Sequence, residues 1–149
     1  MARRFEELEV WQESRELTRR IYALTLEPGL KGDWDLSRQI RRAAVSVMSN
    51  IAEGFERSST KEFVHALYIA RGSAGEVRSQ LYIVLDAMPQ YHETVSALQN
   101  DYGSLSRRIW NLIRYLQQRS DSSALRESDG EYTIPADVSE RRDSEEPAP

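Results

Sequence analysis

The feature that most constrains the fold is a series of apolar residues that follow one another at alternating steps of four and three. The longest series comprises Phe63, Leu67, Ala70, Ala74, Val77, Leu81, Val84 and Met88. A second series comprises Leu98, Tyr102, Leu105, Ile109, Leu112 and Leu116. This spacing keeps one side of a helix apolar, as in helices that lie side by side in a bundle. It predicts two long packed helices, which Pro89 separates.

The stretch from residue 39 to residue 57 is apolar around most of its helical circumference. Its core line comprises Ile40, Ala44, Val47 and Ile51, and a second line beside it comprises Val45, Met48, Ala52 and Phe55. A helix that is apolar on most sides is buried from more than one direction. In a chain this short, the pattern predicts contacts both within the subunit and with another subunit.

Local signals place the ends of the helices. Residues 5–25 carry apolar side chains at helical spacing, and residues 28–32, which include a proline and two glycines, end that helix. Asp33 and Asp35 are both candidate caps for the helix that follows. Residues 59–62, Ser-Thr-Lys-Glu, have the form of a capping box and begin the third helix.

Four helices joined by short links predict an all-α chain that folds as an antiparallel up-down four-helix bundle. The periodic pattern stops near Arg119, where the bundle is expected to end. Gly72 and Gly75 lie inside the third helix, at a helix-propensity cost of about 1 kcal/mol each relative to alanine. They indicate either the close approach of another helix or surface positions without a special role.

The chain divides near Arg119 into two segments of opposite charge. Residues 1–119 contain 17 basic and 15 acidic residues, whereas residues 120–149 contain 3 basic and 9 acidic residues. The second segment also holds six serines and three prolines, so it has too little apolar surface to offset the entropy lost on ordering. We therefore expect a bundle over residues 1–119 and a disordered acidic tail over residues 120–149.

Composition excludes several classes of protein. The chain has no cysteine, which excludes disulfides and thiolate metal sites. Its first residues are charged and do not resemble a signal peptide, and no window reaches the roughly 18 apolar residues of a membrane span. A cytoplasmic protein without a membrane partner is expected.

No pattern of residues favours catalysis. Glu62 and His65 have the spacing of half of a carboxylate-bridged di-metal motif, but His92, the only other histidine, lacks a glutamate three residues before it. No serine lies in a glycine-flanked turn, and no glycine-rich loop that could hold a phosphate occurs. The sequence predicts that the protein is not an enzyme and uses no metal or cofactor.

Seven polar residues lie close to the apolar lines of the second and third helices. They are Ser46, Asn50, Glu53, Arg57, Ser73, Glu76 and Gln80. We expect a hydrogen-bonded network that fixes the register of the helices or the contact between subunits. The alternative is a site in which Glu53 and Glu76 act as a paired acid and base.

Four linked motifs resemble the bacterial family known as four helix bundle proteins. They are Phe-Glu-Glu-Leu-Glu-Val-Trp-Gln at 5–12, Gln-Ile-Arg-Arg-Ala-Ala-Val-Ser-Val at 39–47, Ser-Asn-Ile-Ala-Glu-Gly-Phe at 49–55, and Ile-Ala-Arg-Gly-Ser at 69–73 followed by Glu76 and Gln80-Leu81. This family includes proteins encoded by intervening sequences within 23S ribosomal RNA genes. It is related to the accessory protein of diversity-generating retroelements, in which the partner is a reverse transcriptase.

The resemblance covers about residues 5–116. It implies an antiparallel bundle that assembles into a ring, commonly a pentamer, with a basic face that is suspected of binding RNA or DNA. The chain departs from the family pattern in the link over residues 26–36, at Met48, where many members have proline, and in its acidic tail.

The arginines recur at helical spacing, so each set shares one face of its helix. The sets are Arg15 with Arg19, Arg38 with Arg41 and Arg42, Arg71 with Arg78, and Arg107 with Arg114. In a ring, the same arginines repeat around the axis and form a continuous basic band that can displace counterions from phosphates. In a monomer they would form a solvated surface with intrahelical ion pairs, such as Glu16 with Arg20.

The sequence thus predicts a homo-oligomer that binds RNA or DNA through arginines, without strong sequence preference. A reverse transcriptase is a candidate protein partner. The alternative is a protein-interaction adaptor that binds no nucleic acid. In that case the acidic tail would tune the contacts or shield the basic band.

Overall fold

The structure, a computed structural model, describes residues 2–123. Its long helices are α1 (Glu9–Thr25), α3 (Trp34–Glu56), α4 (Thr60–Ala87) and α5 (His92–Ser123). Its short helical segments are η1 (Phe5–Glu7), α2 (Pro28–Lys31) and η2 (Pro89–Tyr91). Every regular element within residues 2–123 is helical, which confirms the predicted all-α class.

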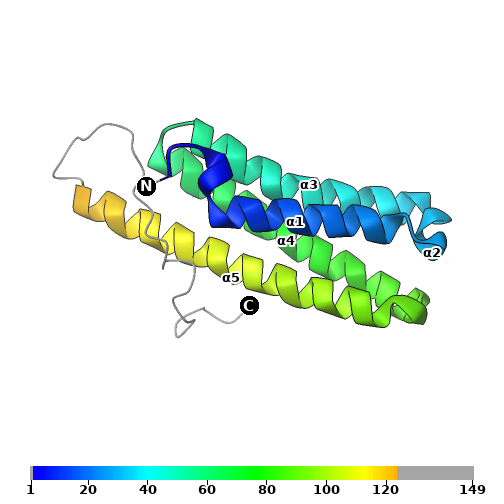
Figure 1. The fold of residues 1–149 in the computed structure, drawn as a ribbon. Helices are drawn as coiled ribbons and strands as arrows, with labels where there is room; N and C mark the ends of the chain where they lie inside the picture. The colour runs from blue at the N-terminus through cyan, green and yellow to red at the C-terminus, as the bar shows by residue number, and fades with distance from the viewer. Residues whose placement is uncertain (1, 124–149) are drawn as a thin grey trace.

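The four long helices lie side by side and run in alternating directions (Figure 1). Helix α3 packs against α1 and α4, while α5 packs extensively against α4 and less extensively against α1. Helices α1 and α4 therefore occupy opposite corners of the bundle. This arrangement confirms the antiparallel four-helix bundle.

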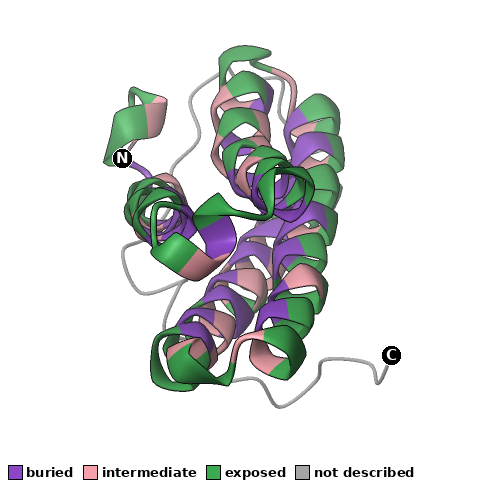
Figure 2. Cartoon of the chain, turned by 90° about the vertical axis from the view of Figure 1, so that its right-hand side faces the viewer, coloured by how far each residue is buried: buried purple, intermediate pink, exposed green. Residues whose placement is uncertain are grey.

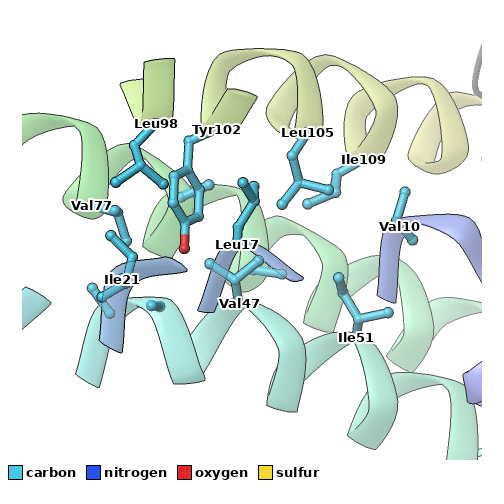
Figure 3. Packing of buried hydrophobic residues seen from close by; sticks show 14 of the residues in the cluster. Val10, Leu17, Ile21, Val47, Ile51, Val77, Leu98, Tyr102, Leu105 and Ile109 are labelled. Carbon is cyan, nitrogen blue, oxygen red and sulfur yellow. The ribbon is translucent and has the colours of Figure 1, made fainter. Parts of the chain in front are cut away.

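The core is built from the apolar series found in the sequence. The core line of α3 is fully buried, and so are the six residues of the series on α5, apart from traces of exposure at Leu112 and Leu116. On α4 the series is buried except for Met88, which lies just beyond the end of the helix and is half-buried. Buried residues occupy the inward sides of the helices (Figure 2). Figure 3 shows Leu17, Val47 and Tyr102 meeting there from three helices.

The second apolar line of α3 is only partly covered within the chain. Met48, Ala52 and Phe55 are half-buried, and Val45 is exposed. Phe55 meets Phe63 of α4 edge to face, with ring centroids 5.8 Å apart. The contact of this line with another subunit stays a prediction.

Glycines mark both a close approach and an open surface. A Cβ at Gly54 of α3 would lie 2.4 Å from the Cβ of Ala66 on α4, so only glycine fits between the two helices. In contrast, a Cβ at Gly72 or Gly75 would meet nothing within 4 Å among the described residues. Within the subunit, these two glycines therefore accommodate no neighbouring helix.

The caps are partly as predicted. Asp33, rather than Asp35, caps α3, because its carboxylate accepts a hydrogen bond from the backbone N–H of Leu36 at 3.1 Å. Ser59 caps α4 by accepting from the backbone N–H of Glu62 at 3.4 Å. The Glu62 carboxylate, however, lies 3.6 Å from a guanidinium nitrogen of Arg57. The serine half of the capping box is thus confirmed. The glutamate instead forms an ion pair with Arg57, the C-cap residue of α3.

Three boundaries differ from those predicted. The first helix begins at Glu9, because the extended backbone of Leu8 separates it from η1. The link after α1 contains the short helix α2, and α5 continues past Arg119 to Ser123. From residue 124 onward, the expected disordered tail lies outside the described residues. None of the helices in the described range is long and apolar enough to cross a membrane.

Candidate nucleic-acid interface

The outer junction of α4 and α5 gathers four of the arginines predicted to bind nucleic acid. Helix α4 contributes two arginines and a tyrosine, and α5 contributes two arginines and a tryptophan. On each helix these residues follow one another at steps of three, four or seven, so they return to the same side. Together they form the arginine seam: Tyr68, Arg71, Arg78, Arg107, Trp110 and Arg114.

An aromatic contact joins the two helices within the seam. The guanidinium carbon of Arg71 lies 4.9 Å from the centre of the Trp110 ring, which is the geometry of a cation–π contact. Tyr68 meets the same ring edge to face, with centroids 6.2 Å apart and an interplanar angle of 66°. Tyr68 remains 43% exposed, so one aromatic side chain of the seam is open to solvent.

Farther along the seam, two guanidinium groups converge over a glycine. A Cβ at Gly103 of α5 would lie 3.7 Å from Arg107 Nη1 and 4.0 Å from Arg78 Nε. Gln99 fixes the register at this level, because its amide nitrogen donates to the backbone carbonyl of Arg78 at 3.2 Å. Arg107 also donates to the hydroxyl of Ser104 at 3.1 Å. Arginines from both helices thus present a joint cationic surface.

The helices that form the seam carry few acidic residues. Residues 63–85 of α4 include only Glu76, and residues 94–120 of α5 include only Asp101. Asp101 lies on the α1 side of α5, where its carboxylate binds Arg20 at 2.5 Å. The positive potential of the seam is therefore little reduced by carboxylates of α4 and α5.

The other side of α5 has a different electrostatic character. A shallow groove of about 320 Å³ lies between α1 and α5, and four of its five charged residues form ion pairs across the two helices. Arg20 binds Asp101, and Arg108 binds Glu13. The predicted pair of Glu16 with Arg20 is wrong, because Arg20 reaches α5 instead. The charges in this groove therefore compensate one another across the two helices.

The arginines of α1 lie away from the seam. Arg19 binds the carboxylate of Glu16 through Nε at 2.9 Å, and this hydrogen bond lowers the pKa of Glu16. The guanidinium carbon of Arg15 lies 5.7 Å from the centre of the Trp11 ring. Because α1 and α4 occupy opposite corners, these two arginines cannot share one surface of a subunit with Arg71 and Arg78.

The arginines of α3 form a third group. Arg41 is half-buried, donates to the Thr25 hydroxyl at 2.7 Å, and lies 4.5 Å and 5.6 Å from the ring centres of Tyr22 and Trp34. Its neighbours Arg38 and Arg42 are exposed. The nine predicted arginines therefore lie in three groups on one subunit, and the seam is the largest.

The structure divides the predicted polar network into separate parts. The hydroxyls of Ser46 and Ser73 lie 2.8 Å apart and join α3 to α4. The side-chain amide of Asn50 donates to the carbonyl of Ser46 at 2.8 Å and to its hydroxyl at 3.0 Å. These three residues form the serine–asparagine cluster, in which the Ser46–Ser73 hydrogen bond links the two helices.

The remaining members of the network lie elsewhere. Glu53 binds Arg57 at 2.7 Å on the exposed last turn of α3. Gly54 lies against Ala66, ten residues before Glu76, so Glu53 and Glu76 are about 15 Å apart along the bundle. That separation does not favour the acid–base pair. Gln80 is half-buried, and its side-chain oxygen has no hydrogen-bond partner among the described residues.

The residues weighed for metal binding are far apart. Glu62 and His65 are exposed on the first turns of α4, and His92 begins α5 beyond the other end of α4. A helix of 28 residues spans about 42 Å, which separates the two histidines widely. Within residues 2–123, no group of three or more His, Asp or Glu side chains could hold a metal ion.

Sequence analysis missed the aromatic members of the seam. Trp110 follows Arg107 by three residues and precedes Arg114 by four, so helical spacing alone could have placed it with them. The facing position of Tyr68 and Arg71 depends on the register of α4 against α5. No single-helix pattern contains that information.

A family model described as 23S rRNA-intervening sequence protein matches residues 6–111. A solved structure described as a protein with unknown function from the S23 ribosomal protein family, from Bacteroides thetaiotaomicron VPI-5482, is similar with a TM-score of 0.64 and 24% identity. The similarity covers 70% of this chain and 97% of that one, and it supports the fold. The curated proteins gave no match. The family match spans most of the bundle, and the chain therefore belongs to the 23S rRNA-intervening sequence protein family.

Proposed function

We propose that the protein is a non-enzymatic homo-oligomer that binds RNA or DNA through the arginine seam. The observation that carries this proposal is the convergence of four arginines and two aromatic side chains at the α4–α5 junction. Guanidinium groups bind phosphate oxygens through paired hydrogen bonds. Aromatic rings beside them can stack on unpaired bases with little dependence on sequence.

The seam is better suited to binding single-stranded nucleic acid than to reading the base sequence of a duplex. Its arginines lie along the junction of α4 and α5, and the exposed ring of Tyr68 lies at the level of Arg71. Within residues 2–123, α4 and α5 are long helices packed side by side in the bundle, rather than a separate helix that could enter a major groove as a recognition helix does. Binding is therefore expected to follow the backbone phosphates and to depend strongly on salt.

We further propose that copies of the chain associate through the α4 ridge, the outward line of α4 beside the seam. The α4 ridge comprises Ile69, Gly72, Gly75, Ser79, Tyr82 and Ile83. Tyr82 is 60% exposed and Ile83 is 51% exposed, and the two glycines between the apolar residues leave room for a close helix contact. A pentameric ring, as the family resemblance implies, requires this surface to meet a different surface of the next subunit.

Association would increase the effect of the seam. A monomer presents four arginines there, which are few for tight binding at physiological salt. In a closed ring the seam repeats around the axis, so several seams can bind one strand at the same time. Oligomerisation and nucleic-acid binding are thus two parts of one proposal.

The test measures the anisotropy of labelled single-stranded RNA and DNA oligonucleotides during titration with the protein at several salt concentrations. If four arginines contact phosphates, the logarithm of the affinity should fall against the logarithm of salt with a slope of about −3 per seam. The double variant Arg78→Glu/Arg107→Glu should weaken binding at least tenfold and reduce the slope. A salt-independent affinity, or an unchanged affinity in this variant, would exclude the seam as the site that binds nucleic acid.

A matched control has the same change in charge on another surface. The variant Arg15→Glu/Arg19→Glu reverses two exposed arginines of α1, at the opposite corner from α4. Its affinity should fall far less than that of the seam variant. Equal losses in both variants would show that net charge, rather than the seam, governs binding.

Association is tested by size exclusion with light scattering at low salt, with absorbance at two wavelengths. The expected result is a mass near five subunits with excess absorbance from bound nucleic acid. Ile83→Asp should reduce the mass, whereas Leu26→Asp, which alters another exposed aliphatic residue just after the end of α1, should not. A monomeric parent chain would contradict the ring.

A protein-interaction adaptor is the second candidate function, and the exposed apolar residues of the α4 ridge favour it. In that case, the ridge holds a partner protein, with a reverse transcriptase as the candidate from the family resemblance. The two functions differ in a direct way. If the protein is an adaptor, the Ile83→Asp variant should no longer bind the partner protein. The parent protein should then show no salt-dependent binding of oligonucleotides.

A further inference from the structure

We infer that the arginine seam has a second occupant, the acidic C-terminal segment 124–149 of the same chain, which competes there with nucleic acid. This inference rests on the proposed function of the seam. It goes beyond that function because it names a ligand within the chain and a regulation of the site.

The charges of the two partners are complementary. Segment 124–149 contains eight acidic residues and three arginines, a net charge of −5, and five of its acids lie between residues 137 and 146. The seam contains four arginines, on helices that carry one acidic residue each along its length. Carboxylates bind guanidinium groups in the same paired geometry as phosphates do. A surface suited to a phosphate backbone is therefore also suited to this segment.

The position of the segment favours binding within the same chain. It follows directly from the end of α5 at Ser123, and α5 is one of the two helices of the seam. Arg114 and Arg107 lie nine and sixteen residues before that end, at about 14 Å and 24 Å along the helix. An extended chain of 26 residues can span about 85 Å, so the acidic part can fold back over both arginines without strain.

The apolar residues of the segment match the aromatic part of the seam. Tyr132 and Ile134 lie between two acidic groups of the segment. On the seam, Tyr68 and Trp110 lie beside Arg71. A ligand with carboxylates at both ends and an aromatic residue between them would complement that order of charge and ring. The α1–α5 groove, in contrast, has no aromatic residue among the described residues that line it.

Tethering makes such a weak contact effective. A ligand tethered beside its site through a short linker has an effective concentration on the order of millimolar. The segment would displace nucleic acid that is bound weakly through one seam. It would not displace strands that contact several seams at once. The segment would thus raise the selectivity of a ring for long strands.

The first experiment neutralises the segment in the full-length protein. The variant Asp137→Asn/Glu140→Gln/Asp143→Asn/Glu145→Gln/Glu146→Gln should bind a short oligonucleotide about tenfold more tightly at low salt, as expected when a tethered competitor is lost. The control Ser128→Ala/Ser139→Ala/Ser144→Ala changes the same segment without changing its charge and should leave the affinity unchanged. An unchanged affinity in the neutralised variant would overturn the inference.

The second experiment detects docking without nucleic acid, because neutralisation also changes the net charge. The chain has no cysteine, so Ser139→Cys provides a single site for a nitroxide label. The label should broaden the indole N–H resonance of Trp110 in the seam but not that of Trp34, which begins α3 at the far end of the bundle. Adding oligonucleotide should restore the Trp110 resonance. Absence of broadening at Trp110, or equal broadening at both tryptophans, would overturn the inference.

The two experiments separate this inference from the proposed function. If Trp110 is broadened but the neutralised protein binds no oligonucleotide, the segment occupies the seam and the proposed function fails. If binding depends on Arg78 and Arg107 but Trp110 is not broadened, the proposed function stands and docking of the segment is wrong.

Discussion

Arg71 of α4 covers the ring of Trp110 of α5, with 4.9 Å between the guanidinium carbon and the ring centre. The contact places a charged group at the junction of two helices and holds it over an indole ring. Side chains held in this way lose less entropy when they bind a ligand than freely mobile ones do. The pair therefore connects the stability of the bundle with the proposed binding surface.

The first prediction concerns Arg71→Lys. An ammonium group keeps the charge but cannot lie flat on the ring, so the free energy of unfolding should fall by about 0.5–1 kcal/mol in urea titrations. Oligonucleotide affinity should fall a few-fold, because the planar fork for phosphate is also lost. The matched change Arg78→Lys, beside Gly103 rather than over a ring, should leave stability within about 0.3 kcal/mol of the parent. Equal destabilisation by both changes would contradict the role of the indole.

The second prediction compares glycines that lie in opposite environments. Gly54→Ala places a Cβ 2.4 Å from that of Ala66, and we expect a loss of about 1–3 kcal/mol in unfolding free energy from forced separation of α3 and α4. Gly72→Ala and Gly75→Ala meet open space in the subunit, so each should stabilise an isolated subunit by up to about 1 kcal/mol through helix propensity.

The same two surface glycines also test the α4 ridge. If subunits meet there at close distance, Gly72→Ala should weaken association, as seen by light scattering at decreasing protein concentration. Subunit stability would then rise while the mass of the assembly falls. Association that is unchanged in both variants would place the subunit contact on another surface.

The sequence predicted the core well, because burial follows the spacing of apolar residues. The line of Ile40, Ala44, Val47 and Ile51 is fully buried as expected. The spacing of apolar residues gave less information about where α5 ends, because the apolar pattern stops before the helix does. Helix α5 continues past Arg119 through polar residues such as Ser120 and Asp121, which helical hydrogen bonds can accommodate without an apolar pattern.

The seam could be predicted only in halves. Spacing along α4 grouped Arg71 with Arg78, and spacing along α5 grouped Arg107 with Arg114. Their convergence depends on the register of the two helices, which is visible only where Gln99 bonds the backbone of Arg78 and where both guanidinium groups meet over Gly103. The same limit applies to the polar residues, which one-dimensional spacing grouped together and the structure separates.

The third prediction concerns the serine–asparagine cluster. Ser73→Ala removes the partner of the Ser46 hydroxyl, and it should lower the unfolding free energy by about 1 kcal/mol. A double-mutant cycle of Ser46→Ala with Ser73→Ala should give a coupling energy of about 0.5–1.5 kcal/mol. Ser79→Ala, on the exposed side of α4, serves as the control and should change stability by less than about 0.5 kcal/mol. A coupling near zero would show that the contact does not stabilise the register.

The last prediction concerns pH and Tyr102, whose ring lies in the core of the bundle (Figure 3). Burial raises the pKa of Tyr102 above its ordinary value, while the nearby Thr18 hydroxyl lowers it by a smaller amount. Because the pKa is higher in the folded than in the unfolded chain, the stability from the neutral phenol is complete below about pH 10 and is lost as pH rises further.

Tyr102→Phe should therefore reduce the alkaline loss of unfolding free energy, by up to about 1.4 kcal/mol per pH unit above pH 10. At neutral pH the variant should lie within about 1 kcal/mol of the parent, because the phenol has no well-formed hydrogen bond among the described residues. Urea titrations between pH 7 and pH 11 measure both effects. The control Tyr82→Phe removes a hydroxyl that is largely exposed, so it should keep the alkaline slope of the parent. If Tyr102→Phe also keeps that slope, ionisation of Tyr102 is not linked to unfolding, and the alkaline loss of stability arises from other groups.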